Sequence, residues 1–202
     1  SKTWVYIGDW EQFSNNSQGA LAAYASALKS KSDNLEALQS RATLNLKLGQ
    51  LEPARVDIEK IRKLSPKSLA VRYLQALLAF KEKKYPEARD SLQAALKIAP
   101  NNLPTLLLGG LIENALDNPQ TAELHLNKVV RASPHNSYAL RILADTQLRL
   151  GRPDDAEKTL APIDMEKVKD AGVLVVAGQI ALAKNEFSKA ASHFEKAAEL
   201  SP

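Results

Sequence analysis

The stretch Tyr85–Pro134, YPEARDSLQAALKIAPNNLPTLLLGGLIENALDNPQTAELHLNKVVRASP, decides the fold because it contains one pattern twice, 34 residues apart. In each copy a small residue precedes a large apolar residue by four positions and a proline follows: Ala88, Leu92 and Pro100, then Ala122, Leu126 and Pro134. Residues four apart share one helix face, so the small residue lets a neighbouring helix approach and the large residue fills the space beside it. A proline cannot continue the helical hydrogen bonds without strain. The stretch therefore predicts closely packed helices that end before each proline.

The same period of 34 extends over the whole chain of 202 residues. Three positions of the repeat keep their character throughout. The eighth is always small, the twentieth is always alanine, and the twenty-fourth is always large and apolar: Gly8, Ala42, Ala76, Gly110, Ala144 and Gly178; Ala20, Ala54, Ala88, Ala122, Ala156 and Ala190; Tyr24, Ile58, Leu92, Leu126, Leu160 and Phe194. A fixed period of this length is typical of helical repeat arrays. We therefore predict one domain over residues 1–202, with repeats at 1–34, 35–68, 69–102, 103–136, 137–170 and 171–202.

Start and turn residues divide each repeat into two helices. Residues suited to cap a helix N-terminus stand near the repeat boundaries: Asn34, Ser68, Asn102, and Asn136 or Ser137. Within the repeats, turns are marked by glycines or by prolines near the start of the second helix: Gly49, Gly151, Pro53, Pro86, Pro119 and Pro153. The sequence thus predicts an all-α protein of paired antiparallel helices, each of roughly 12–14 residues and joined by tight turns.

The fifth repeat departs from the pattern. Pro162 falls inside its second helix, and Val168 replaces the closing proline. Because proline interrupts a helix, we expect this helix to end near Leu160 or Ala161. A looser segment over residues 162–170 should follow.

Residue types that carry catalysis or bind metals are sparse. The chain has no cysteine, which excludes disulfides, thiolate metal sites and a cysteine nucleophile. His125, His135 and His193 lack the spacing of metal ligands, and no glycine-rich phosphate loop occurs. No apolar stretch is long enough to span a bilayer. We therefore expect no enzyme activity, no metal and no cofactor.

A cluster of basic residues in the second repeat alternates with acidic ones. It comprises Arg55, Lys60, Arg62, Lys63 and Lys67, interleaved with Glu52, Asp57 and Glu59. A solvated outer helix face explains such a mixture. Nucleic-acid binding calls for a continuous basic stripe with interleaved aromatic residues, which is missing although the net charge is +4. We therefore expect no nucleic-acid partner.

The repeat pattern resembles that of the tetratricopeptide repeat (TPR) family over all six repeats. Three repeats carry it most fully: Trp4, Gly8, Ala20, Tyr24 and Ala27; Ala76, Tyr85, Ala88, Ala95 and Pro100; Gly178, Phe187, Ala190, Phe194, Ala197 and Pro202. The resemblance implies a right-handed α-solenoid of six helix-turn-helix repeats, whose concave groove binds proteins or peptides.

Residues 73–163 are similar to a narrower group, the TPR-repeat lipoproteins of the bacterial PEP-CTERM/exosortase system, or PrsT family. The most similar phrases are APNNLPTLLLGG, NSYALRILADTQLRLGRPDDAEKTL and the final AASHFEKAAELSP. This resemblance implies a protein of the bacterial periplasm, or one anchored to the outer membrane by a lipid attached upstream. It also implies a role in exopolysaccharide export or PEP-CTERM protein sorting, and a chain excised from a longer array.

The family's groove positions on the first helix of each repeat supply the candidate partner-binding residues. Read onto this sequence they are Tyr73, Leu77, Phe80, Lys81, Leu107, Leu111, Asn114, Tyr138, Arg141, Asp145 and Arg149. They predict an apolar centre and a polar edge in repeat five. The three leucines equally suit seams between neighbouring helices, and Arg141 and Asp145 equally suit an ion pair with each other. None of the repeats has the Lys/Asn pair of the TPR subclass that binds acidic chaperone tails.

We predict a non-catalytic scaffold that binds a protein or peptide in this groove. Direct binding of polysaccharide near Tyr138–Arg149 and a regulatory arm of a larger enzyme are the alternatives. Trp10 and Phe13, on the first helix, are expected to be partly exposed and to suit pairing with another copy.

Overall fold

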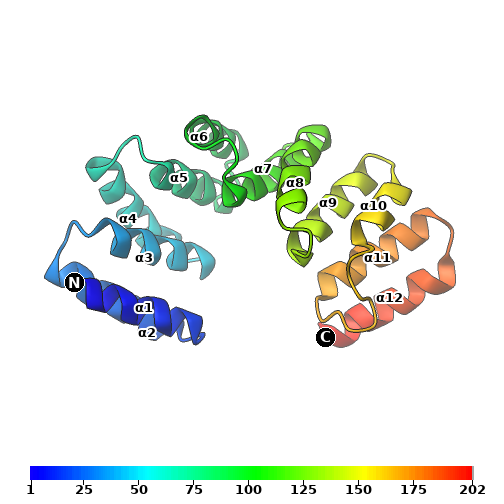
Figure 1. The fold of residues 1–202 in the computed structure, drawn as a ribbon, viewed down its shortest axis with the longest axis horizontal. Helices are drawn as coiled ribbons and strands as arrows, with labels where there is room; N and C mark the ends of the chain where they lie inside the picture. The colour runs from blue at the N-terminus through cyan, green and yellow to red at the C-terminus, as the bar shows by residue number, and fades with distance from the viewer. Residues whose placement is uncertain (202) are drawn as a thin grey trace. The chain divides into compact units, whose positions relative to one another are not determined.

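The computed structural model describes residues 1–201, and within them it contains twelve α-helices and no strand (Figure 1). They are α1 (Lys2–Phe13), α2 (Ser17–Ser30), α3 (Leu35–Lys47), α4 (Leu51–Leu64), α5 (Leu69–Lys81), α6 (Tyr85–Ile98), α7 (Leu103–Ala115), α8 (Pro119–Ala132), α9 (Ser137–Arg149), α10 (Pro153–Leu160), α11 (Ala171–Ala183) and α12 (Phe187–Leu200). The all-helical class and the six helix pairs are confirmed. Pro202, predicted to close the sixth repeat, lies outside the described residues.

The chain forms two compact units, Ser1–Pro100 and Asn101–Pro202. In the first unit α1 packs on α2, α3 on α4 and α5 on α6, and α2 and α4 also contact the first helix of the next pair. The second unit repeats this arrangement with α7–α8, α9–α10 and α11–α12. First helices of successive repeats touch as well, α3 with α5 and α7 with α9. Such nearest-neighbour packing is typical of repeat proteins. That residues 1–202 form a single domain stays a prediction.

Helices α3, α5, α7 and α9 begin at the predicted caps. The side-chain oxygen of each cap residue accepts a hydrogen bond from the backbone amide three residues on, at 3.2, 3.4, 3.1 and 3.1 Å for Asn34, Ser68, Asn102 and Asn136. In this way one of the amide donors that a helix leaves without an internal partner is satisfied. Ser137 is the first residue of α9 rather than its cap.

Glycine at the eighth repeat position allows the two helices of a pair to pack closely. A methyl group built on Gly8 would lie 2.4 Å from the Tyr24 ring. The same construction gives 2.5 Å from Leu126 at Gly110 and 2.7 Å from Phe194 at Gly178. The eighth and twenty-fourth positions are therefore in direct contact in these three repeats.

The prediction of a solvated face for the charged cluster in repeat two is wrong for Asp57, which is fully buried. Its carboxylate accepts two hydrogen bonds from Arg41 on α3, at 2.8 and 2.7 Å. These bonds are the main reason that the pKa of Arg41 is raised. A bidentate pair of this kind satisfies a charge that would otherwise be costly to bury.

The interruption predicted in repeat five is confirmed. Helix α10 ends at Leu160 after 8 residues, whereas the other second helices have 14. Residues 161–170 then run as turns and bends to Asp170, which caps α11. The cause is Pro162, which has no amide hydrogen to continue the helix.

Candidate binding surfaces

The predicted groove residues of the first unit lie on α5. Tyr73 and Leu77 are half-buried and pack against a core cluster that includes Leu38 and Leu74. Burial raises the pKa of Tyr73. Phe80 contacts the Tyr85 ring, with 5.7 Å between the ring centroids, which is within the usual range for aromatic pairs. Leu77 thus takes part in core packing, as the alternative reading allowed.

Helix α7 carries three more candidates in the second unit. Leu107 and Leu111 are half-buried and pack against the core cluster of Leu126 and Leu143, so they too fill a seam. Asn114 Nδ2 donates to Thr146 Oγ1 on α9 at 2.7 Å. This bond ties α7 to α9.

Helix α9 presents the most exposed aromatic residue among the candidates. Tyr138 is 41% exposed, and the guanidinium carbon of Arg141 lies 5.0 Å from its ring centroid. That distance is within the range of a cation–π contact. The ion pair of Arg141 with Asp145 is not seen in the described part of the chain.

Arg149 links the polar edge of α9 to α7. It donates to the backbone carbonyl of Asn114 and to the carboxylate of Asp117, both at 2.8 Å. Together with the Asn114–Thr146 bond, these contacts join Asn114 to Arg149 across α7 and α9, while Tyr138, Arg141 and Asp145 lie nearer the start of α9. We call Asn114, Tyr138, Arg141, Asp145 and Arg149 the α7–α9 surface.

Lys81 is exposed at the end of α5. It belongs to the first unit with Tyr73, Leu77 and Phe80, whereas Leu107 and Leu111 belong to the second. The predicted apolar centre that joins these two groups stays a prediction.

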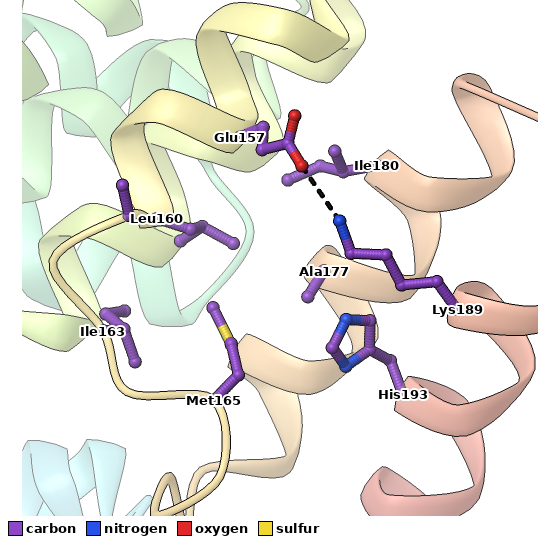
Figure 2. A pocket seen from close by; sticks show the side chains of 9 residues that line it. Glu157, Leu160, Ile163, Met165, Ala177, Ile180, Lys189 and His193 are labelled. Atoms are coloured by element: carbon purple, nitrogen blue, oxygen red, sulfur yellow. Dashed lines mark hydrogen bonds and ion pairs between the residues drawn. The ribbon is translucent and has the colours of Figure 1, made fainter. Parts of the chain in front are cut away.

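The sequence interpretation missed a pocket within the second unit, beside the shortened α10. Its volume is about 260 Å³ (Figure 2). The side chains come from α10, from the segment after it, from α11 and from α12: Glu157, Leu160, Ala161, Ile163, Met165, Ala177, Ile180, Lys189 and His193. Pro162 was the available sign, because a shortened helix leaves uncovered the space that its last turns would fill.

One side of this pocket is charged. Glu157 accepts a hydrogen bond from Lys189 at 3.0 Å (Figure 2) and a second from Lys184. These two bonds lower the pKa of Glu157, with Lys184 contributing most. Burial, helped by Lys189 and Lys196, lowers the pKa of His193, so its ring is neutral near pH 7.

Within residues 1–201 the structure holds no group of three or more histidine, aspartate or glutamate residues arranged to bind a metal ion. Each helix described there is too short or too polar to cross a membrane.

Helix pairs that follow one another along the chain, each packed on the next, define the class of helical repeat proteins. Models of the tetratricopeptide repeat match residues 114–175 and 171–202, and a model of anaphase-promoting complex (cyclosome) subunit 3 matches residues 14–95. The TPR family is supported for this chain by these models and by solved structures of TPR proteins. No curated protein sequence matches it.

Three solved structures illustrate the likeness in fold. The Cut9–Hcn1 hetero-tetramer of the APC/C superposes with a TM-score of 0.91 at 16% identity, over 99% of this chain and 40% of that one. A TPR protein from Parabacteroides merdae gives 0.74 at 24% identity, over 98% and 78%. YrrB, described as a TPR protein with an unusual peptide-binding site, gives 0.66 at 20% identity, over 89% and 93%.

Proposed function

We propose that the chain is a non-catalytic scaffold that binds a protein or peptide through the first helices of its repeats. The observation that carries this proposal is the α7–α9 surface, where an exposed tyrosine is stacked under an arginine on a helix fixed to its neighbour. Tyrosine and arginine are enriched among the residues that dominate binding energy in protein interfaces. A rigid support reduces the entropy lost when a partner binds.

The similar proteins support the same reading. YrrB is described as having a peptide-binding site, and Cut9 is part of a multi-subunit assembly. The matching family models describe repeat modules and an assembly subunit rather than catalytic domains.

Affinity capture with separate variants for the two units tests the proposal. Phe80→Ala truncates an aromatic residue of α5, and Arg141→Glu reverses the charge beside Tyr138. Arg62→Glu is the control, because it makes the same charge reversal at an exposed residue of α4. We expect partners captured by the unaltered protein to be lost with Phe80→Ala or Arg141→Glu and retained with Arg62→Glu, as read by mass spectrometry. Recovery of the same proteins with all forms contradicts the proposal.

We further propose that the scaffold acts in the bacterial envelope, in exopolysaccharide export or PEP-CTERM protein sorting. The support is the sequence similarity of residues 73–163 to the PrsT lipoproteins. The protein produced from its complete reading frame should then partition with envelope membranes through a lipid-modified cysteine upstream of Ser1. Recovery in the cytoplasmic fraction, without lipid modification, contradicts this setting.

Polysaccharide is a second candidate ligand of the α7–α9 surface, because Tyr138 offers an exposed ring beside Arg141, on the helix that also carries Asp145 and Arg149. Sugars commonly stack on such rings while carboxylate and guanidinium groups hydrogen-bond their hydroxyls. Calorimetric titration with purified exopolysaccharide separates the two candidates. Saturable binding that Tyr138→Ala abolishes favours polysaccharide, and the absence of heat favours a protein partner.

A further inference from the structure

The pocket beside α10 exists because repeat five lacks the last turns of its second helix. Helix α10 ends at Leu160, and the following segment, which carries Ile163 and Met165, runs along the side of the pocket opposite Lys189 and His193 of α12 (Figure 2). This segment is held by a hydrogen bond from the Ile163 amide to Leu160 O at 2.9 Å and by the ion pair of Glu166 with Lys196 at 3.0 Å. The pocket is therefore a feature of one repeat, and it is separate from the α7–α9 surface.

The interior of the pocket is apolar and partly adaptable. Leu160, Ile163, Ala177 and Ile180 supply branched or small side chains, and Met165 adds a thioether. Methionine adapts to the shape of its neighbours, and its sulfur makes favourable contacts with aromatic rings. Apolar cavities of about 150 Å³ bind benzene, so this larger pocket has room for one substituted aromatic ring.

His193 supplies the hydrogen-bonding group of this interior. Its Nδ1 is buried and has no hydrogen-bond partner among the described residues, which leaves Nε2 as the ring nitrogen that can meet a ligand. In a neutral imidazole Nε2 either donates or accepts a hydrogen bond, depending on the tautomer. A hydroxyl group matches both tautomers because it can donate and accept.

The edge of the pocket has the composition of a protein interface. Glu157 and Lys189 are 40% and 51% exposed in their side chains and form an ion pair at the rim. An apolar centre surrounded by polar, solvent-accessible groups is the usual anatomy of a protein-binding patch. Tyrosine is among the side chains that most often anchor such patches.

We propose that this pocket binds a phenol ring, presented as a tyrosine side chain of a partner polypeptide. The ring lies against Met165 and the aliphatic side chains, and its hydroxyl hydrogen-bonds His193. The inference does not depend on the groove function, because no residue of the α7–α9 surface lines the pocket.

Met165 makes the proposal directly testable, since it is the only methionine of the chain. Protein labelled with ¹³C in the methionine methyl gives one such signal, and an aromatic ring bound beside it shifts that signal. We expect a saturable shift on titration with N-acetyl-tyrosinamide. N-acetyl-phenylalaninamide should bind about three- to tenfold more weakly, the range expected for one neutral hydrogen bond.

Variants assign the effect to the pocket. His193→Phe keeps a ring in place and should remove the preference for tyrosinamide over phenylalaninamide. His125→Phe is the matched control, because His125 occupies the same repeat position on α8, and it should keep the preference. Ala177→Leu fills the pocket and should abolish both shifts. Ala161 lies at an exposed position of the rim. If Ala177→Leu impairs folding, Ala161→Leu is the second pocket-filling variant and should abolish both shifts.

Four results would overturn the proposal. They are a Met165 signal that does not saturate, equal binding of the two amides to unaltered protein, unchanged binding by the pocket-filling variants, and a response to 4-methylphenol but not to N-acetyl-tyrosinamide. The last would make the pocket a site for free phenols rather than for a polypeptide.

Discussion

At the scale of single residues, Gly110 shows how packing overrides helix propensity. It lies inside α7, where alanine would be favoured by about 1 kcal/mol from propensity alone. The added methyl group, however, would overlap Leu126 of α8. Because interiors are close-packed, this overlap forces the two helices apart.

We therefore expect Gly110→Ala to lower the free energy of unfolding by about 1–3 kcal/mol, the usual cost of overpacking. Urea denaturation, monitored by circular dichroism, measures this change in the free energy of unfolding. Leu126→Ala should be less costly in the Gly110→Ala background than in the unaltered protein, because the new methyl group then occupies part of the space left behind. A stabilised Gly110→Ala variant would show that the helix pair has room to spare.

The ion pair of Arg41 and Asp57 predicts a second effect. Arg41→Met leaves the buried carboxylate unpaired, and we expect a loss of about 3 kcal/mol in the free energy of unfolding. Arg62→Met is the control, since it removes an exposed pair with Glu59 and should cost less than about 1 kcal/mol. The double variant Arg41→Met/Asp57→Leu should recover most of the loss. Equal costs for the two single variants would contradict the assigned role.

The sequence predicts the contacts of a residue when its partner lies at a fixed distance along the chain. A cap such as Asn34 acts on the next turn, and Gly8 meets Tyr24 because both recur with the repeat. Asp57 was misplaced because its partner lies on another helix and does not recur. The exposure of the Tyr138 ring could not be predicted either, because the periodicity does not encode it.

At the scale of elements, Glu157 connects the short α10 to the end of α11 and the start of α12 through Lys184 and Lys189. Both lysines favour the charged carboxylate and lower its pKa. A depressed pKa means that the stabilisation is present above the ordinary carboxyl pKa and is lost as the pH falls through the lower, folded-state value.

We predict that the Glu157 carboxyl titrates below its ordinary value of about 4.3 when followed by NMR. Lys184→Gln should return the midpoint further toward that value than Lys189→Gln, since the hydrogen bond from Lys184 is the larger cause. An unshifted midpoint in the unaltered protein would mean that solvent screens these contacts.

The shortened α10 was itself predictable because proline acts locally. The pocket beside it was not, since its lining combines side chains of the segment after Leu160 with side chains of α11 and α12. The sequence also leaves open which face of each first helix the core covers, as Leu77, Leu107 and Leu111 show.

At the scale of the whole molecule, each unit has its own cores. Clusters around Leu38 and Tyr24 lie in the first unit, and clusters around Leu140 and Leu126 lie in the second. Three helix pairs are about the least that a repeat array needs for stability.

We therefore predict that fragments 1–100 and 101–202 each fold alone, with cooperative thermal unfolding by circular dichroism. Fragment 1–83 is the control, because it keeps α5 but loses α6, which packs against it. It should unfold at a lower temperature than fragment 1–100. Equal stability of these two fragments would indicate that α6 contributes no core.

The interruption at Pro162 has one more consequence. In a perfectly periodic array every repeat presents the same surface. One partner could therefore bind at several equivalent positions along the array. A single repeat with a truncated helix makes these positions different from one another. The shortened second helix gives the fifth repeat a surface that its neighbours lack, and a partner can distinguish this repeat by that surface.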